Sequence, residues 1–395
     1  MRPFWLATAL CTALLGCTSA DRRSTDALLP CCALHLAEMP PTWRPTPAEL
    51  ARSSDRPWTR AEAADARRAV ERGFDEMVAW LAAHPRETEA LGNDAVEAVL
   101  DVSYAAGHMP ELRRRAREVA RRLLEPLVAR LLAPGANAQD DADFATLLPL
   151  AVYAHQLFGH TDPRSIALVR RSNAALAASG SLAAALDCDP NAVLENPRAA
   201  NDDVYDLVMW AISLTEAQVV PGLSLPFGSR ALMPRLWRYL ARYPLIGARE
   251  YAEGANDETF YDTAYLATHI GYIPTGYGRH ALHVADAPWL YRFLRENFYP
   301  VLAMGELDLL AEFVDLLRQY GCDETNDRQV RDGSRYLLRV FHAAGQSFMA
   351  HRESYETGAV EPYDLIHKAW TGIAGLRTRE VESPGPGTYG SVFRR

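Results

Sequence analysis

The chain has 395 residues, of which 49% are hydrophobic and 23% are charged, and its formal net charge is −9. The hydrophobic content excludes a disordered or mucin-like protein. The negative charge balance argues against a nucleic-acid partner, because proteins that bind polyanions need a basic surface. Only one of the 41 basic residues is a lysine, Lys368, so a Schiff-base mechanism has a single candidate position.

The N-terminus is predicted to be a targeting segment, residues 1–17. Arg2 precedes an apolar stretch that is too short to span a membrane and is typical of a signal peptide. The sequence Leu14-Leu15-Gly16-Cys17 resembles the lipobox of bacterial lipoproteins. This resemblance implies that Cys17 is lipidated and becomes the mature N-terminus, and Thr18 in place of Asp indicates the outer membrane, facing the periplasm. An ordinary signal peptide with a chance cysteine is the alternative.

The rest of the chain is expected to form one domain with irregular ends. Residues 18–58 are rich in proline, serine and threonine and are predicted to be a tether. Residues 381–395 are rich in glycine and proline and are predicted to be an irregular tail. No break in composition divides the region between them, so we expect residues 59–380 to form a single domain.

Four cysteines lie outside the signal region: Cys31, Cys32, Cys188 and Cys322. They show no CxxC spacing and no histidine pairing that is typical of zinc sites. In an oxidising compartment, Cys188 and Cys322 are candidates for a disulfide. Buried free thiols are the alternative.

A helical repeat occupies the region from Arg60 to Leu376. Every second helix is strongly apolar and opens with an aspartate, at intervals of 46 to 63 residues. The six aspartates are Asp94, Asp143, Asp206, Asp262, Asp308 and Asp364. The helices between them are more polar and rich in arginine. A repeat of about 50 residues built from two helices is typical of stacked helical hairpins.

Six such hairpins predict an all-α (α/α)6 toroid, with an inner barrel of apolar helices and an outer wall of arginine-rich helices. The pattern resembles the α/α-toroid superfamily, which includes terpenoid cyclases, prenyltransferase β-subunits, six-hairpin glycosidases and polysaccharide lyases. The C-terminal stretches LLRQYG, VRDGSRYLLRVFHAAGQSF and YDLIHKAWTGIAGL strengthen the resemblance. It implies a fold and a central cavity, but no particular reaction.

A polar stripe marks the fourth apolar helix. Glu258, Asp262, Tyr265 and His269 are spaced by 4, 3 and 4 residues, so they share one helix face. Carboxyl, phenol and imidazole groups together are suited to acid/base chemistry. We predict these four as catalytic, with Asp262 as acid or base, His269 as its partner and Tyr265 positioning the substrate. The alternative is a capping Asp262, a solvated Glu258 and a core His269 bonded to Tyr265.

Aromatic and acidic residues on three apolar helices are predicted to bind substrate, because such groups around one cavity suit a sugar or a terpenoid. They are Tyr205, Asp206, Tyr261, Tyr363, Asp364, His367 and Trp370. His280 and His283 can be combined with His269 as a metal cluster, but a surface or loop role is favoured and no metal is predicted. Motifs for nucleotides and for serine or zinc hydrolases do not occur, so no cofactor is expected.

Two functions remain open at this point. The first is an envelope lipoprotein whose toroid cavity binds a glycan or another bulky organic substrate and acts on it by acid/base chemistry, as a lyase, hydrolase or epimerase. The second is a non-catalytic lipoprotein that binds a ligand or a protein partner in envelope assembly. In both, the lipid anchor makes the membrane a partner.

Overall fold

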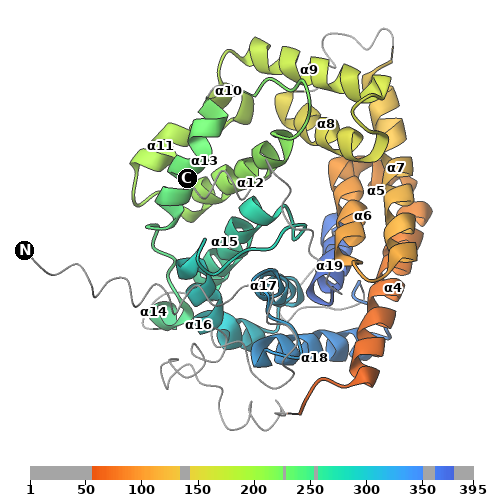
Figure 1. The fold of residues 1–395 in the computed structure, drawn as a ribbon, viewed down its shortest axis with the longest axis vertical. Helices are drawn as coiled ribbons and strands as arrows, with labels where there is room; N and C mark the ends of the chain where they lie inside the picture. Colours follow the sequence, from red (N-terminus) through yellow and green to blue (C-terminus); the bar gives the residue numbers. More distant parts are fainter. Residues whose placement is uncertain (1–55, 134–142, 226–227, 253–256, 350–360, 378–395) are drawn as a thin grey trace, which may run out of the picture.

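The computed structural model describes residues 56–133, 143–225, 228–252, 257–349 and 361–377. These ranges contain sixteen helices, α4 to α19, and no strand (Figure 1). The all-α prediction is therefore confirmed for this part of the chain. None of these helices combines the length and the apolar character that a membrane crossing requires. The predicted signal peptide with Cys17, most of the tether and the tail lie outside the described residues.

The apolar helices expected from the repeat are all present. They are α6 (Asn93–Ala105), α8 (Phe144–Phe158), α12 (Asn201–Ala217), α15 (Asp257–Thr275), α17 (Leu307–Gln319) and α19 (Pro362–Gly375). The more polar long helices are α4 (Arg60–Ala83), α7 (Pro110–Leu131), α9 (Pro163–Ser179), α13 (Gly228–Leu240), α16 (Pro288–Met304) and α18 (Arg328–Ala343). Four short helices lie in connections: α5 (Pro85–Leu91), α10 (Leu182–Leu186), α11 (Pro190–Glu195) and α14 (Ala248–Ala252).

The apolar helices pack on one another in chain order. Helix α6 contacts α8, α8 contacts α12, α12 contacts α15, α15 contacts α17, α17 contacts α19, and α19 contacts α6. The polar helices pack against them from outside, for example α7 on α6, α9 on α8 and α18 on α17 (Figure 1). Twelve of the thirteen residues of α17 are buried, from Leu307 to Gln319 with only Asp308 excepted. A helix buried on nearly all sides must carry an apolar sequence, as α17 does.

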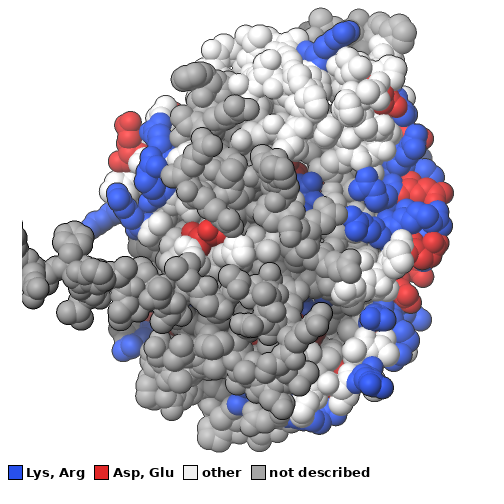
Figure 2. Space-filling view, viewed as in Figure 1, with Lys and Arg blue, Asp and Glu red and all other residues white. Residues whose placement is uncertain are grey.

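Helix α7 buries one face only. In α7, the buried residues Leu112, Ala116, Ala120, Leu124 and Val128 recur every fourth position and face α6 and its neighbours. The arginines of α7 lie on the other faces, where Arg and Asp or Glu side chains intermingle on the surface around α4 and α7 (Figure 2). This is the pattern of a solvated outer helix.

The six repeat aspartates play different structural roles. Asp143 is an N-cap, because its Oδ1 accepts a hydrogen bond from the backbone N–H of Thr146 at 2.8 Å. The other five lie inside their helices; Asp94, for example, is in the first turn of α6. Capping therefore explains one of the six positions, while Asp94, Asp308 and Asp364 lie in the first turns of their helices, where the helix dipole favours an acidic side chain.

The candidate disulfide between Cys188 and Cys322 is not formed. Cys188 and Cys322 are both free thiols. Cys322 is buried after α17, with its Sγ 3.9 Å from the hydroxyl of Tyr291 on α16. Cys188 lies instead near the aspartates at the start of α12, Asp203 and Asp206, which contribute to a raised pKa of its thiol after the larger effect of burial. The two thiols are packed among different helices, so the alternative of free thiols is the correct one.

Candidate functional site

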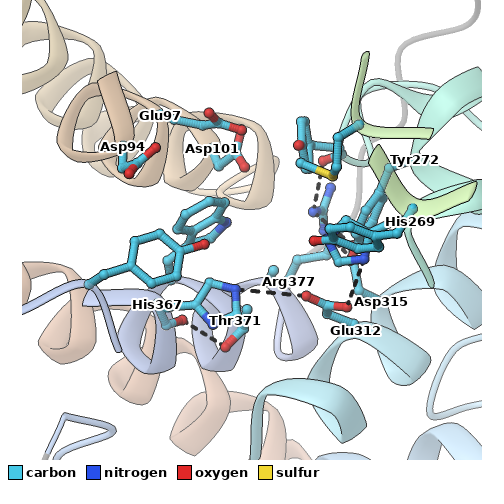
Figure 3. A pocket seen from close by; sticks show the side chains of 16 residues that line it. Asp94, Glu97, Asp101, His269, Tyr272, Glu312, Asp315, His367, Thr371 and Arg377 are labelled. Atoms are coloured by element: carbon cyan, nitrogen blue, oxygen red, sulfur yellow. Dashed lines mark hydrogen bonds and ion pairs between the residues drawn. The ribbon is translucent and has the colours of Figure 1, made fainter. Parts of the chain in front are cut away.

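A cavity of about 590 Å³, including its open mouth, lies between α6, α12, α15, α17 and α19 (Figure 3). Five carboxyl groups line it, three from α6 and two from α17. They are Asp94, Glu97, Asp101, Glu312 and Asp315. Figure 3 shows the α6 acids on one side of the cavity and the α17 acids on the other.

The α6 acids share one helix face, because Asp94, Glu97 and Asp101 are spaced by 3 and 4 residues. The hydroxyl of Tyr153 on α8 donates a hydrogen bond to Glu97 Oε2 at 2.7 Å. Burial, with the nearby charge of Asp94, raises the pKa of Glu97 to about 6. Burial also raises the pKa of Asp101 well above its usual value, and the neighbouring Glu97 adds to this effect.

Glu312 occupies the opposite wall and contacts Thr268 on α15. The Thr268 hydroxyl oxygen lies 2.5 Å from Glu312 Oε2 and 2.6 Å from the carbonyl oxygen of Tyr265. One hydroxyl hydrogen cannot serve both neighbours, and the carbonyl can only accept. The Thr268 hydroxyl therefore donates to one of them at a time, and its oxygen also lies 3.1 Å from Nδ1 of His269. Burial raises the pKa of Glu312 well above its usual value and outweighs the hydrogen bond from Thr268, which lowers it.

His269 presents an unprotonated nitrogen to its surroundings. Its Nδ1 lies 2.9 Å from the carbonyl oxygen of Tyr265, which can only accept, so Nδ1 carries the hydrogen of the neutral ring. Nε2 lies 3.4 Å from the hydroxyl of Tyr205. Burial lowers the pKa of His269 to about 4 and outweighs the hydrogen bond to Tyr265. His269 is therefore a neutral hydrogen-bond acceptor at neutral pH.

His367 on α19 lies on the other side of Glu312. Its Nε2 is 3.9 Å from Glu312 Oε1, while the Nδ1 of His269 is 3.9 Å from Oε2. The His367 ring stacks on Tyr363 and meets Trp370 edge to face, with ring centroids 5.3 and 5.2 Å apart. Burial lowers the pKa of His367. Glu312 is thus flanked by two neutral imidazoles.

Asp315 forms an ion pair with an arginine, whereas Glu312 lies near two histidines. The Nε of Arg377 lies 2.5 Å from its Oδ1, and Gln319 donates to its Oδ2 at 2.7 Å. Arg377 also donates to the carbonyl oxygens of Gly278 and Tyr277, at 2.9 and 3.2 Å. Arg377 therefore ties α17 to the loop after α15, which carries Tyr277 into the cavity lining.

Five of the eleven predicted catalytic and substrate-binding residues line this cavity. They are Tyr205, His269, Tyr363, His367 and Trp370. Two more pack beside it, since the ring of Tyr265 stacks between those of Tyr261 and Tyr205, with centroids 5.7 and 5.8 Å away. These residues come from α12, α15 and α19, the three apolar helices on which the sequence predicted the site.

The predicted aspartates do not reach the cavity. Asp206, Asp262 and Asp364 are exposed and are not part of its lining, and the side chain of Glu258 lies outside the described residues. Asp262 shares a helix face with His269, but the two lie about 10 Å apart along the helix axis. Helix α15 thus lines the cavity with its later residues, such as His269. Asp262 is on the same face but nearer the start of the helix, and it is exposed there.

Sequence reasoning missed the acids that the cavity does contain. Glu97 and Asp101 follow Asp94 at helical spacing in DAVEAVLD, and Glu312 and Asp315 follow Asp308 in DLLAEFVD. Both segments place acids at helical spacing on an otherwise apolar helix, the same signal that singled out α15. Tyr272, Tyr277 and Arg377 carry no such signal, because the tertiary packing brings them in.

Within the described ranges, no group of three or more histidine, cysteine, aspartate or glutamate side chains is arranged to hold a metal ion. His280 is buried and His283 is exposed, and neither lines the cavity that contains His269.

Comparison of the chain with protein-family models, with curated proteins and with solved structures finds no match. The functional argument therefore depends on the cavity itself.

Proposed function

We propose that the domain is an (α/α)6 toroid whose cavity is the active site of a glycan-cleaving acid/base enzyme, a hydrolase. The cyclic order of contacts from α6 through α19 and back to α6 supports the toroid. The observation that carries the enzymatic proposal is the pair of opposed carboxyl groups, Glu97 on α6 and Glu312 on α17, with different proton affinities.

Two carboxyl groups whose environments separate their pKa values can act as an acid and a base at the same pH. Glu312 is protonated and donates its proton to the oxygen of the leaving group as the bond to the sugar carbon breaks. Glu97, with its pKa near 6, accepts a proton from the water that attacks this carbon. Solvent then restores the starting protonation states, so the net reaction consumes one water molecule.

The remaining lining suits a polyhydroxylated substrate. The rings of Tyr205, Tyr363 and Trp370 offer faces for the apolar faces of sugar rings. The acceptor nitrogen of His269 and the phenol groups offer hydrogen-bond partners for hydroxyl groups. We infer that His269 orients the substrate, because its low pKa makes it a weak base.

We also propose that the enzyme is anchored in the outer membrane by lipidated Cys17 and faces the periplasm. The lipobox-like sequence before Cys17 and the proline-rich segment after it support this placement. A tethered domain would act on envelope glycans within its reach.

The test is release of reducing ends from a panel of oligosaccharides by the purified full chain. Glu312→Gln and Glu97→Gln should each lower kcat/KM by about 100-fold or more, since each removes one proton-transfer group. Asp202→Asn, an exposed acid on α12, is the matched control and should keep full activity. Full activity in Glu312→Gln would overturn the assignment of the acid, and full activity in Glu97→Gln that of the base.

A further inference from the structure

Asp101 is a buried carboxyl group with no partner of its own. It is 7% exposed and lines the cavity, and no hydrogen bond or ion pair joins it to any described residue. Burying such a group without a partner is costly, so buried acids are normally paired. Figure 3 shows it beside Glu97 on the α6 wall. A ligand group is the natural partner for a carboxyl group in this position.

The charged groups that face Asp101 do not neutralise it. Glu97 comes from its own helix and Asp315 from α17, and both add negative charge. Two arginines lower its pKa from a distance, but each is held elsewhere: Arg377 pairs with Asp315, and Arg279 pairs with Glu216. Of the five carboxyl groups in the described lining, Asp315 pairs with its single arginine and Glu312 is assigned as the protonated acid, so Asp94, Glu97 and Asp101 on α6 remain without a cation in the lining.

This charge balance restricts the substrate. An anionic sugar such as a uronate would meet the carboxyl groups of α6, whereas a protonated amine has N–H donors and a charge that suit Asp101. The faces of Tyr363 and Trp370 in the same lining also attract a cation. Asp94, Glu97 and Asp101 are spread over about 10 Å of helix, which suits the amines of successive sugar units better than a single metal ion.

We propose that the cavity selects an amine-bearing saccharide, whose ammonium group pairs with Asp101. The inference rests on the proposed glycan-cleaving function, because it names the substrate class of that same cavity. It assigns to Asp101 the recognition of substrate charge, and it leaves proton transfer to Glu312 and Glu97.

The experiment is isothermal titration calorimetry on the full chain with Glu312→Gln, which prevents turnover. The ligands are the trisaccharides of glucosamine, N-acetylglucosamine and galacturonic acid at pH 6.5. We expect the glucosamine trimer to bind at least tenfold more tightly than the N-acetylated trimer, and the galacturonate trimer to show no binding.

Adding Asp101→Asn should weaken binding of the glucosamine trimer about tenfold, the size expected for one charged hydrogen bond, and should leave the N-acetylated trimer unaffected. Asp202→Asn in the same background is the matched control and should change neither affinity.

Equal affinity for the two trimers would overturn the inference, as would tight binding of calcium chloride titrated alone, which would identify a metal site. A thermal melt of Asp101→Asn checks folding, so that a loss of affinity in a folded variant is attributed to the lost charge. The two proposals can fail separately. If the amine preference is absent, the substrate class is wrong, but cleavage of neutral glycans can still be observed. If Glu312→Gln still cleaves glycans, the assignment of the acid is wrong, but the amine preference can still be observed.

Discussion

The hydroxyl oxygen of Thr268 lies 2.5 Å from Glu312 Oε2 and 2.6 Å from the carbonyl oxygen of Tyr265, so it bridges the proposed acid and the backbone of α15. Burial raises the pKa of Glu312 well above its usual value, and the hydrogen bond from Thr268 opposes this effect without cancelling it. The acid also lies between His269 and His367, at 3.9 Å from each. The neighbours of Glu312 are therefore a threonine and two imidazoles whose pKa values burial lowers, and its proton is retained because burial disfavours the carboxylate.

Thr268→Val tests the bridge. The change keeps the shape of the side chain but leaves Glu312 without its hydrogen-bond partner in a buried position, which should cost about 1–3 kcal/mol of stability. Urea unfolding of the variant measures this cost. Thr325→Val, in an exposed loop, is the matched control and should cost less. A variant as stable as the native protein would show that the bridge is unimportant.

The pH profile of kcat/KM should be bell-shaped. Activity should rise through about pH 6 as Glu97 loses its proton, and fall at higher pH as Glu312 loses its own. Tyr153→Phe removes the hydrogen bond that stabilises the Glu97 carboxylate, so the rising limb should move up by as much as about one pH unit. Initial rates between pH 4 and 9 measure both effects. A rising limb that stays in place would exclude Glu97 as the base.

Stability at acidic pH should depend on His269. Because burial lowers its pKa from 6.5 to about 4, the unfolded chain binds a proton that the folded protein does not bind within this window. His269 should therefore destabilise the fold as pH falls from 6.5 to 4, by on the order of 3 kcal/mol. His269→Gln lacks the titrating group, and the difference between native and variant unfolding free energies should shrink or reverse over that range. His342→Gln, an exposed histidine, is the control.

Glycine is required at position 278 for two reasons. Its φ is +83°, and a Cβ there would overlap the guanidinium of Arg377. Gly278→Ala should destabilise the protein by more than the roughly 1–2 kcal/mol expected for the left-handed backbone alone. Gly321→Ala isolates the backbone effect, because Gly321 has a φ of +95° and open space where a Cβ would lie. Denaturant titrations of the two variants give the comparison, and equal losses would argue against a tight contact with Arg377.

Membrane attachment should depend on Cys17. Cys17→Ala should leave the chain without a lipid and move it from the membrane fraction to the soluble fraction, because a single cysteine supplies the anchor. Cys11→Ala changes a cysteine in the apolar stretch and should leave attachment unchanged. Membrane fractionation with immunodetection measures both. Persistent attachment of Cys17→Ala would count against lipidation.

The local pattern of the sequence was enough to predict the long helices. The alternation of apolar and arginine-rich segments is a local property, and it predicted the all-α class and the twelve long helices between Arg60 and Gly375, but not the four short helices α5, α10, α11 and α14 in the connections. It also identified His269 and His367, since a polar residue in the middle of an apolar helix must find a partner inside the protein.

Only the tertiary structure decided which end of each helix reaches the cavity. Asp262 and His269 share a face of α15, yet one is solvated and the other is buried, because exposure changes along a helix as well as around it. Glu97 and Glu312 are 215 positions apart, and their opposition across one cavity depends on how α6 and α17 are placed. Their pKa values are set by this burial and by their new neighbours, which helical spacing does not encode.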